Sequence, residues 1–279
     1  MLTNHPHMTS VPSMEFIAAR NLEEALDAKA AAPSSEFLAG GTDLMVEINL
    51  AHHRPDSVIS LRRVDELRDA QPNRIAAGTT WAELERGTWV GLAEAARTVG
   101  SPQIRATGTI GGNVATASPA GDGLPWIAAA DASIAVRSSE RGERILPWRS
   151  FFTGVKKTAL EPDEMVTAVV LPDNVPETQA FAKVGTRNAM VISTVSCLVM
   201  RGDDGFRIAL GSVAPTPIRA HRAEELLNGE QAPSDAVLAE VARVVSEDVS
   251  PITDHRSTEA YRRHAAGVLA RRLVERCLP

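Results

Sequence analysis

Aromatic residues, excess positive charge and long apolar runs are all scarce in this 279-residue sequence, and each shortage excludes a class of protein. Aromatic residues make up only 4% of the chain, with a single tyrosine, and the formal net charge is −6. Binding to nucleic acid requires stacking side chains and a basic face, so we expect no nucleic-acid partner. No stretch approaches the roughly 18 consecutive apolar residues of a membrane helix, so we expect no membrane span.

Metal ligands are few and badly spaced. The only cysteines are Cys197 and Cys277, whereas an iron–sulfur cluster usually takes about four ligands. None of the seven histidines has a zinc-type spacing to a second ligand. We therefore expect no metal site on this chain, and we expect Cys197, which lies in an apolar run, to be a buried thiol.

Familiar catalytic and phosphate-binding motifs are missing as well. The sequence contains no G-x-G-x-x-G, no G-x-x-x-x-G-K-[ST] and no G-x-S-x-G. No acid–base constellation stands out, so we expect no catalytic residue. Residues 1–13 lack the basic start and apolar middle of a secretory signal, which favours a cytoplasmic protein.

Two stretches that each carry a pair of adjacent glycines organise the chain. The first reads FLAGGTDLM over residues 37–45, and the second reads TGTIGGNVATASPAGD over residues 107–122. We expect each pair at a turn that ends an apolar, strand-like run, where glycines let the backbone approach a ligand closely. Consecutive N–H groups in such turns form a concavity that binds anions, and neighbouring hydroxyls add donors. A glycine pair alone is typical of ordinary turns, but two such loops predict a site for the pyrophosphate of a dinucleotide.

The segments Ala39–Leu44 and Thr109–Asn113, with Ser118 and Asp122 beyond them, resemble the FAD-binding medium subunit of the molybdenum hydroxylases. This family includes the xanthine dehydrogenase and carbon monoxide dehydrogenase type enzymes, and the resemblance covers nearly the whole chain. It implies an α+β fold with two subdomains that clasp FAD, of the PCMH type found in vanillyl-alcohol oxidase-like flavoproteins. A C-terminal α+β domain with a three-stranded antiparallel sheet and helices should follow. The expected boundaries are 1–62, 63–174 and 175–279.

The resemblance also implies which residues contact FAD, with the pyrophosphate between the two glycine loops. The implied contacts are Leu38, Ala39, Gly40, Gly41, Thr42, Asp43, Leu44, Thr109, Ile110, Gly111, Gly112, Asn113, Ser118, Asp122, Met165 and Lys183.

Three of these residues have alternatives or a special role. Asp122 is expected to accept hydrogen bonds from ribose or flavin; the alternative is that it caps a turn. Lys183 is expected to offset the charge on reduced flavin; the alternative is a surface lysine. Asp43 is expected to accept hydrogen bonds from its own loop. The loops contain no histidine or cysteine suited to covalent attachment, so FAD should be dissociable.

The function that the resemblance implies is electron transfer within a complex. A molybdenum cofactor on a large subunit would oxidise the substrate, and [2Fe-2S] clusters on a small subunit would pass the electrons to FAD. The flavin would then reduce NAD⁺, oxygen or another acceptor, in a dimer of heterotrimers. Two alternatives stay open, a stand-alone FAD-dependent oxidoreductase and a structural or regulatory nucleotide-binding module. Purines, aldehydes, carbon monoxide and N-heterocycles are all possible substrates.

The remaining sequence predicts local structure. Asn21 and Thr80 have the pattern of helix N-caps, with Glu83 completing a capping box. Strands are expected over residues 178–184, 189–200 and 206–213, with a hairpin turn at residues 203–205. The final helix is expected over residues 257–276, and Arg262 is expected on a solvated or partner-facing side.

Overall fold

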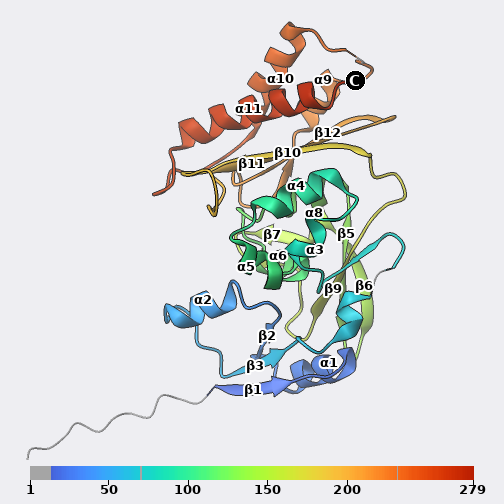
Figure 1. Cartoon of the computed structure of the whole chain (residues 1–279), viewed down its shortest axis with the longest axis vertical. Coiled ribbons are helices and arrows are strands. Elements are labelled where there is room, and N and C mark those ends of the chain that lie inside the picture. The colour runs from blue at the N-terminus through green and yellow to red at the C-terminus, as the bar shows by residue number, and fades with distance from the viewer. Residues whose placement is uncertain (1–13, 70, 231) are drawn as a thin grey trace, which may run out of the picture.

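The computed structural model describes residues 14–69, 71–230 and 232–279, and its elements form three tiers along the long axis of the molecule (Figure 1). The expected N-terminal features at residues 1–13 lie outside this description. No helix in the described ranges is both long and apolar enough to cross a membrane.

The first tier is a parallel three-stranded sheet in the order β1-β3-β2. Its elements are β1 (Glu15–Ala18), α1 (Leu22–Ala31), β2 (Glu36–Leu38), α2 (Leu44–Asn49) and β3 (Ser57–Ser60), followed by the 3₁₀ helix η1 (Asp65–Arg68). Asn21 caps α1 as predicted, because its side-chain oxygen accepts a hydrogen bond from the Glu24 N–H at 2.8 Å. The first glycine loop leaves this sheet at the end of β2.

The second tier is an antiparallel sheet in the order β4-β9-β5-β6, with short helices packed against it. The strands are β4 (Arg74–Ala76), β5 (Ser133–Ser138), β6 (Gly142–Pro147) and β9 (Met165–Val170), and a separate hairpin is formed by β7 (Phe152–Gly154) and β8 (Lys157–Thr158). The helices are α3 (Trp81–Leu84), α4 (Val90–Thr98), α5 (Pro102–Thr107), α6 (Ile110–Thr116), α7 (Leu124–Ala129) and α8 (Trp148–Phe151). The predicted capping box of Thr80 and Glu83 opens α3.

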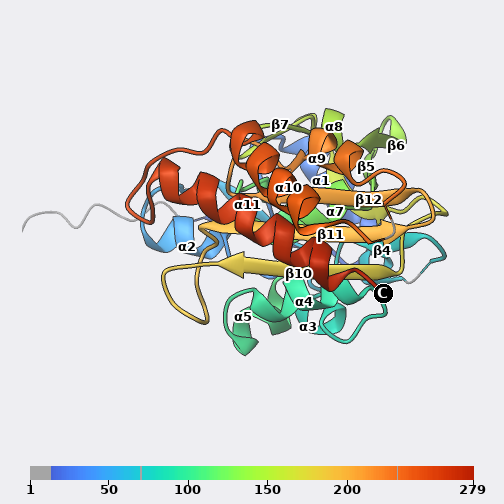
Figure 2. The same ribbon diagram turned by 90° about the horizontal axis from the view of Figure 1, so that it is seen from above.

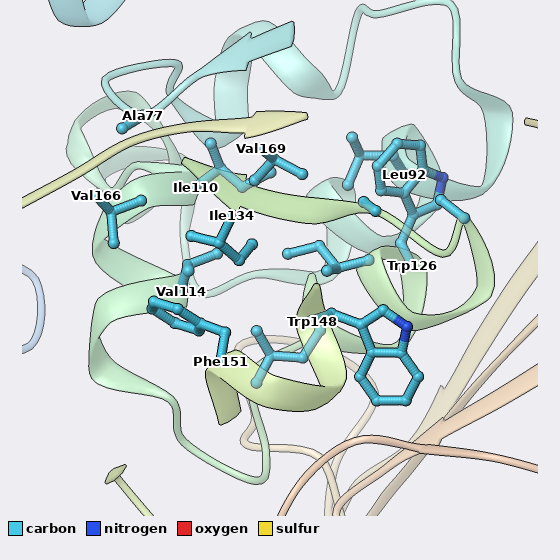
Figure 3. Close-up of a cluster of buried hydrophobic side chains, with 14 of the residues drawn as sticks. Ala77, Leu92, Ile110, Val114, Trp126, Ile134, Trp148, Phe151, Val166 and Val169 are labelled. Atoms are coloured by element: carbon cyan, nitrogen blue, oxygen red, sulfur yellow. The ribbon is translucent and has the colours of Figure 1, made fainter. Parts of the chain in front are cut away.

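A buried apolar cluster holds the helices of this tier to its sheet (Figure 3). Ile110 and Val114 lie on one side of α6 and pack into the cluster with Ile134 of β5 and Val169 of β9. These four side chains are fully buried. Burying each one stabilises the fold by roughly 1.5–3 kcal/mol before the entropy of ordering is subtracted. The start of α6 is therefore held in a fixed position.

The third tier is an antiparallel sheet with two long helices over its outer face (Figure 2). Its elements are β10 (Thr178–Val184), β11 (Val195–Gly202), β12 (Gly205–Gly211), β13 (Ile218–Arg219), α9 (His221–Leu226), α10 (Asp235–Asp248) and α11 (Glu259–Arg276). The two-residue strand β13 makes four strands where three were predicted, because it pairs with β12 beyond a turn. The second predicted strand starts only at Val195, since residues 185–194 form a loop.

Arg262 of α11 is buried, so its predicted solvated position is wrong. Its guanidinium donates to the carbonyl oxygens of Thr194 and Ser212 at 2.6 and 3.1 Å and forms an ion pair with Asp254 at 2.7 Å. Two carbonyls and one carboxylate offset the cost of burying the charge. Arg262 therefore fixes α11 to the loops at the end of the sheet.

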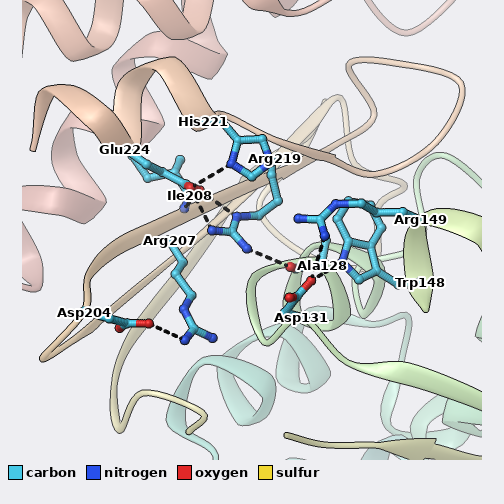
Figure 4. Close-up of polar contacts among 10 residues, drawn as sticks. All are labelled: Ala128, Asp131, Trp148, Arg149, Asp204, Arg207, Ile208, Arg219, His221 and Glu224. Atoms are coloured by element: carbon cyan, nitrogen blue, oxygen red, sulfur yellow. Dashed lines mark hydrogen bonds and ion pairs between the residues drawn. The ribbon is translucent and has the colours of Figure 1, made fainter. Parts of the chain in front are cut away.

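Polar contacts join the third tier to the second. The Gln179 side-chain oxygen of β10 accepts from the Gly91 N–H and the Trp126 indole N–H, both at 3.0 Å. Arg219 of β13 forms a bidentate ion pair with Glu224 and also donates to the Ala128 carbonyl of α7 at 3.4 Å (Figure 4). The inner face of the third sheet is thus attached to α4 and α7.

Candidate functional site

A cavity of about 490 Å³ lies where the first two tiers meet. Most of its described lining comes from the segments around β2, η1, α6 and the start of β9. The lining residues are Phe37, Ala39, Gly40, Leu61, Arg62, Val64, Leu67, Arg68, Ala77, Gly78, Thr80, Ala106, Thr107, Thr109, Gly111, Gly112, Ala115, Leu160, Glu164, Met165 and Val166. Both predicted glycine pairs therefore contribute to the same cavity.

Gly40 allows the first glycine loop to touch the segment that precedes α6. A Cβ atom at Gly40 would lie 1.9 Å from the Thr107 carbonyl oxygen and 2.9 Å from the Gly108 nitrogen. Both neighbours are backbone atoms, which cannot move aside as the end of a flexible side chain could. Gly41 adopts φ +69°, a backbone conformation that favours glycine. The loop thus requires both glycines, for two different reasons.

The first loop carries a run of backbone N–H groups that have no acceptor. Within the described part of the chain, the five consecutive N–H groups of Gly40–Leu44 make no hydrogen bond, whereas the next one, at Met45, donates to the Gly41 carbonyl. Consecutive free N–H groups form an anion-binding concavity. This feature agrees with the donor role predicted for the first loop.

The second glycine pair is arranged differently from the prediction. Gly111 and Gly112 lie in the first turn of α6, not in a turn after a strand. Their N–H groups are already used: Gly111 donates to the Ala77 carbonyl at 2.8 Å, and Gly112 donates to the Thr109 hydroxyl oxygen at 3.1 Å. The N–H groups of Ile110 and Asn113 are bonded to backbone carbonyls as well. The N–H groups of Ile110–Asn113 are therefore not free, whereas the N–H of Thr109, just before α6, has no acceptor among the described residues.

Close approach explains the glycines of the second pair better than hydrogen bonding does. A Cβ at Gly111 would lie 2.5 Å from the Ala77 Cβ, so Gly111 lets α6 rest on Ala77, the residue that follows β4. A Cβ at Gly112 would meet only the Thr109 hydroxyl oxygen, at 3.2 Å. Because Gly112 lines the cavity, a side chain at this position would occupy cavity space. The missing side chain of Gly112 keeps this wall open.

Six of the sixteen predicted contacts line the cavity: Ala39, Gly40, Thr109, Gly111, Gly112 and Met165. Leu38, Gly41, Thr42, Asp43 and Leu44 belong to the end of β2, the first loop and the start of α2. Ile110 is fully buried in the apolar cluster behind the cavity (Figure 3). Asn113, Ser118, Asp122 and Lys183 are not among the lining residues.

Asp43 has a partner other than the predicted one. Its carboxylate makes no capping hydrogen bond to its own loop and instead accepts from the Thr116 hydroxyl at 3.3 Å. This contact joins the first loop to the last turn of α6. Lys156 adds a second link, because its ammonium forms an ion pair with Glu47 of α2 at 2.9 Å and its N–H donates to the Ala117 carbonyl, just after α6, at 3.1 Å. The two glycine segments are therefore tied together outside the cavity.

Two predicted polar contacts lie in or just after α6. The Asn113 side-chain oxygen is buried and has no hydrogen-bond partner among the described residues. The Ser118 hydroxyl accepts from the Ala120 N–H at 3.3 Å, which is a local turn contact. An unpaired buried acceptor costs about 1–3 kcal/mol, so the Asn113 oxygen is in a position to accept a donor from elsewhere.

Asp122 and Lys183 form a buried ion pair at the border between the second and third tiers. The Lys183 Nζ lies 2.6 Å from the Asp122 carboxylate and donates to the carbonyls of Thr98 and Val191 at 2.9 and 3.1 Å. The Ser193 hydroxyl donates to the other Asp122 oxygen. Burial raises the pKa of the Asp122 carboxyl, and the neighbouring ammonium opposes that shift. All three ammonium protons of Lys183 are used, so neither a surface lysine nor a simple turn cap describes this pair.

Several lining residues gave no signal in the sequence. The apolar residues Leu61, Val64 and Leu160 come from irregular segments, and Leu67 comes from η1; none of them belongs to a motif. Glu164 lines the cavity, but Arg144 holds its carboxylate by two hydrogen bonds of 2.7 Å. Although burial acts to raise the pKa of Glu164, that guanidinium holds it below its usual range. Glu164 is therefore an ionised, paired carboxylate and is not suited to be a catalytic base.

Comparison with known proteins decides the family. A model of the FAD binding domain in molybdopterin dehydrogenase matches residues 12–174, and a model of the CO dehydrogenase flavoprotein C-terminal domain matches residues 180–277. The chain belongs to this family. The second match covers the part of the chain that contains the third tier.

Individual relatives of this family are similar over most of the chain. A xanthine dehydrogenase FAD-binding subunit from Escherichia coli O157:H7 is 30% identical over 274 residues, which cover 92% of this chain and 93% of that subunit. A nicotinate dehydrogenase FAD-subunit from Eubacterium barkeri is 35% identical over 238 residues, covering 77% and 79% of the two chains.

The fold matches a solved structure of the same family. A chain of carbon monoxide dehydrogenase from Hydrogenophaga pseudoflava, in a form that lacks the Mo-pyranopterin moiety of its cofactor, superposes with a TM-score of 0.85. The two chains are 30% identical, and the match covers 95% of this chain and 97% of the other. The predicted combination of an FAD-binding part and a C-terminal α+β part is thereby confirmed.

Proposed function

We propose that this chain binds FAD non-covalently in the cavity between β2 and β9. The observation that carries the proposal is the run of five N–H groups without acceptors at Gly40–Leu44, which begins in the cavity lining. Such a run binds phosphate groups. The apolar lining, which includes Phe37, Leu61 and Met165, suits an aromatic ring system. No described lining residue is a histidine or cysteine, which supports dissociable binding.

The residues divide the binding task. The Gly40–Leu44 amides would hold phosphate. The Thr109 hydroxyl oxygen accepts from the Gly112 N–H, which leaves its own O–H to donate to the ligand. Gly112 has no side chain, so the ligand can approach its backbone closely. The unpaired Asn113 oxygen supports a further contact. Leu38, Ile110, Ser118, Asp122, Met165 and Lys183 remain proposed contacts from the family resemblance. The proposed role of Lys183 would require it to exchange one of its present acceptors.

The flavin supplies the redox chemistry when bound, and this chain supplies position and electrostatics. Its own residues need only bind, orient and shield the cofactor. The sole acid that lines the described cavity, Glu164, is already paired with Arg144, so no side chain there is poised to move a proton. This agrees with a role in electron relay. It does not favour a stand-alone oxidoreductase, which would need an acid or base beside its substrate, and the relatives named above are themselves subunits.

We further propose that the chain works between a large molybdopterin-binding subunit and a small subunit with [2Fe-2S] clusters, in a dimer of heterotrimers. Electrons would leave for NAD⁺, oxygen or another acceptor. The division at residues 1–62, 63–174 and 175–279 is supported by the sheets, since none of those described has strands in more than one of the ranges 15–60, 74–170 and 178–219. Two free, buried cysteines support a cytoplasmic location, where thiols stay reduced.

Co-purification with the partner subunits tests the proposed function. The complex should contain molybdenum and iron together with one FAD per copy of this chain, and its flavin absorbance should bleach on anaerobic addition of the oxidisable substrate. A complex without flavin that does not take up added FAD would contradict the proposal. A flavin that turns over substrate on the isolated chain would favour the stand-alone oxidoreductase instead.

A further inference from the structure

Two arginines line the cavity without a carboxylate partner. Arg62 follows β3 and Arg68 is the last residue of η1, and both side chains are exposed. Within the described residues, neither guanidinium forms an ion pair or a hydrogen bond; Arg62 donates only its backbone N–H, to the Ser60 hydroxyl oxygen at 3.5 Å. Arg68 is close enough to Glu83 to act on it electrostatically, but that carboxylate instead accepts hydrogen bonds from Thr80. The cavity thus has two guanidinium groups without a direct ion-pair partner among the described residues, although Glu83 lies near Arg68.

Each arginine lies next to one of the glycine segments. The residue before Arg62 donates its N–H to the Leu38 carbonyl at 2.9 Å, which places Arg62 beside the start of the first loop. The Gly78 N–H donates to the Leu67 carbonyl at 2.7 Å, and a Cβ at Gly78 would lie 3.2 Å from the Arg68 Cγ. Ala77, which precedes Gly78, accepts a hydrogen bond from the Gly111 N–H. Arg68 therefore lies beside the start of α6.

The cavity needs a source of positive charge if it holds phosphates. The described N–H groups provide only partial charges, and only the first glycine segment offers a run of free ones. The chain as a whole carries a net charge of −6, which repels anions. The lining carboxylate Glu164 adds no further attraction, since Arg144 occupies it. A guanidinium at each side of the cavity would supply the missing charge, and arginine matches phosphate geometry well.

We propose that Arg62 and Arg68 bind the phosphate groups of the dinucleotide, as the cationic part of a grip whose other part is the free amides of Gly40–Leu44. This inference rests on the proposed function. It specifies that recognition of the diphosphate depends on side-chain charge as well as on backbone donors. The affinity for an uncharged nucleoside should therefore not depend on either arginine, whereas the affinity for a nucleoside diphosphate should depend on both.

The neighbouring Arg63 offers a matched control. It is exposed like Arg62 and carries the same charge, yet it is not among the lining residues of the cavity. The variants R62Q, R68Q and R63Q change the net charge of the chain equally. Any difference between them in ligand affinity therefore reports position and not overall charge. Arg62 and Arg68 have no described side-chain partner, so none of these changes should disturb folding.

The test measures ADP and adenosine binding to the full-length chain, freed of bound nucleotide, by titration calorimetry at low and at physiological salt. R62Q and R68Q should each weaken ADP binding about tenfold at low salt and flatten its salt dependence. Adenosine affinity should stay the same, and R63Q should change ADP affinity less than about twofold. R68K should recover part of the lost affinity.

Two outcomes would overturn the inference in distinguishable ways. If the wild-type chain binds FAD and ADP while R62Q and R68Q behave like R63Q, the arginines do not bind phosphate and the proposed function stands. If the wild-type chain binds neither FAD nor ADP, the proposed function fails and this inference fails with it. Circular dichroism of each variant confirms that the compared chains are folded.

Discussion

Replacing Gly112 by alanine should separate FAD binding from folding. Gly112 lies in the first turn of α6, and its φ is not positive, so alanine fits the backbone. The added Cβ would meet only the Thr109 hydroxyl oxygen at 3.2 Å. Alanine is the better helix former by up to about 1 kcal/mol. The Thr109 hydroxyl must shift by a few tenths of an ångström, and the gain in helix propensity offsets this, so the unliganded variant should be about as stable as the wild type.

Binding should change in the opposite direction. The new methyl group extends about 1.5 Å from the backbone into a wall of the cavity that is now bare. A ligand packed against Gly112 would have to shift, and even one weakened phosphate contact costs about 1.4 kcal/mol, or tenfold in Kd. We expect FAD affinity to fall at least about tenfold in G112A and further in G112V. Quenching of flavin fluorescence measures affinity, and thermal unfolding of the unliganded chain measures stability.

Gly154 provides the matched control for this comparison. It lies on β7, is not part of the cavity lining, and a Cβ there would meet only Lys157 side-chain atoms at 3.8 Å. G154A should leave both affinity and stability nearly unchanged. The reasoning is refuted if G112A binds FAD like the wild type. A parallel loss of stability and affinity in G112A would also contradict it, since binding and folding would then not be separable at this position.

The buried ion pair, one acidic side chain and the two thiols give three further predictions. Lys183→Met should lower the free energy of unfolding by about 3–5 kcal/mol in urea titrations, because the Asp122 carboxylate stays buried without its partner; an effect below about 1 kcal/mol would contradict this. Although burial acts to raise it, hydrogen bonds from two N–H groups and a guanidinium hold the pKa of Asp254 at about 2. The ionised Asp254 therefore stabilises the fold above the unfolded pKa near 4, and this stabilisation is lost as the pH falls toward 2. In Asp254→Asn, the free energy of unfolding should fall less between pH 4 and pH 2 than in the wild type, by roughly 1 kcal/mol after solvent screening. An unchanged pH dependence in this range would contradict the assignment. Burial raises the pKa of the Cys197 thiol and raises that of Cys277 to about 11, so neither should react with Ellman's reagent at pH 8 until the chain is unfolded.

Much of the fold could be predicted from local chemistry and from the family resemblance. The N-caps at Asn21 and Thr80 were predictable because side-chain oxygens satisfy helix N–H groups over only three residues of sequence. The hairpin turn before Gly205 follows from equally local geometry. The resemblance in the two glycine segments identified the family, which the comparisons confirm.

What escaped prediction depends on contacts between distant segments. Glycine is a poor helix former, so a helix with Gly111 and Gly112 in its first turn is favoured only once its apolar side packs into the core. The burial of Arg262 depends on carbonyls 68 and 50 residues away. Arg62 and Arg68 belong to no motif, and their shared cavity exists only after the first two tiers meet.

Amide hydrogen exchange with and without FAD tests the central claim most directly, because it reads each backbone donor separately. We predict that FAD slows exchange at the free N–H groups of Gly40–Leu44 and leaves Ile110–Asn113 nearly unchanged, since those amides are already bonded within the protein. Strong new protection at Ile110–Asn113 with none at Gly40–Leu44 would contradict the account.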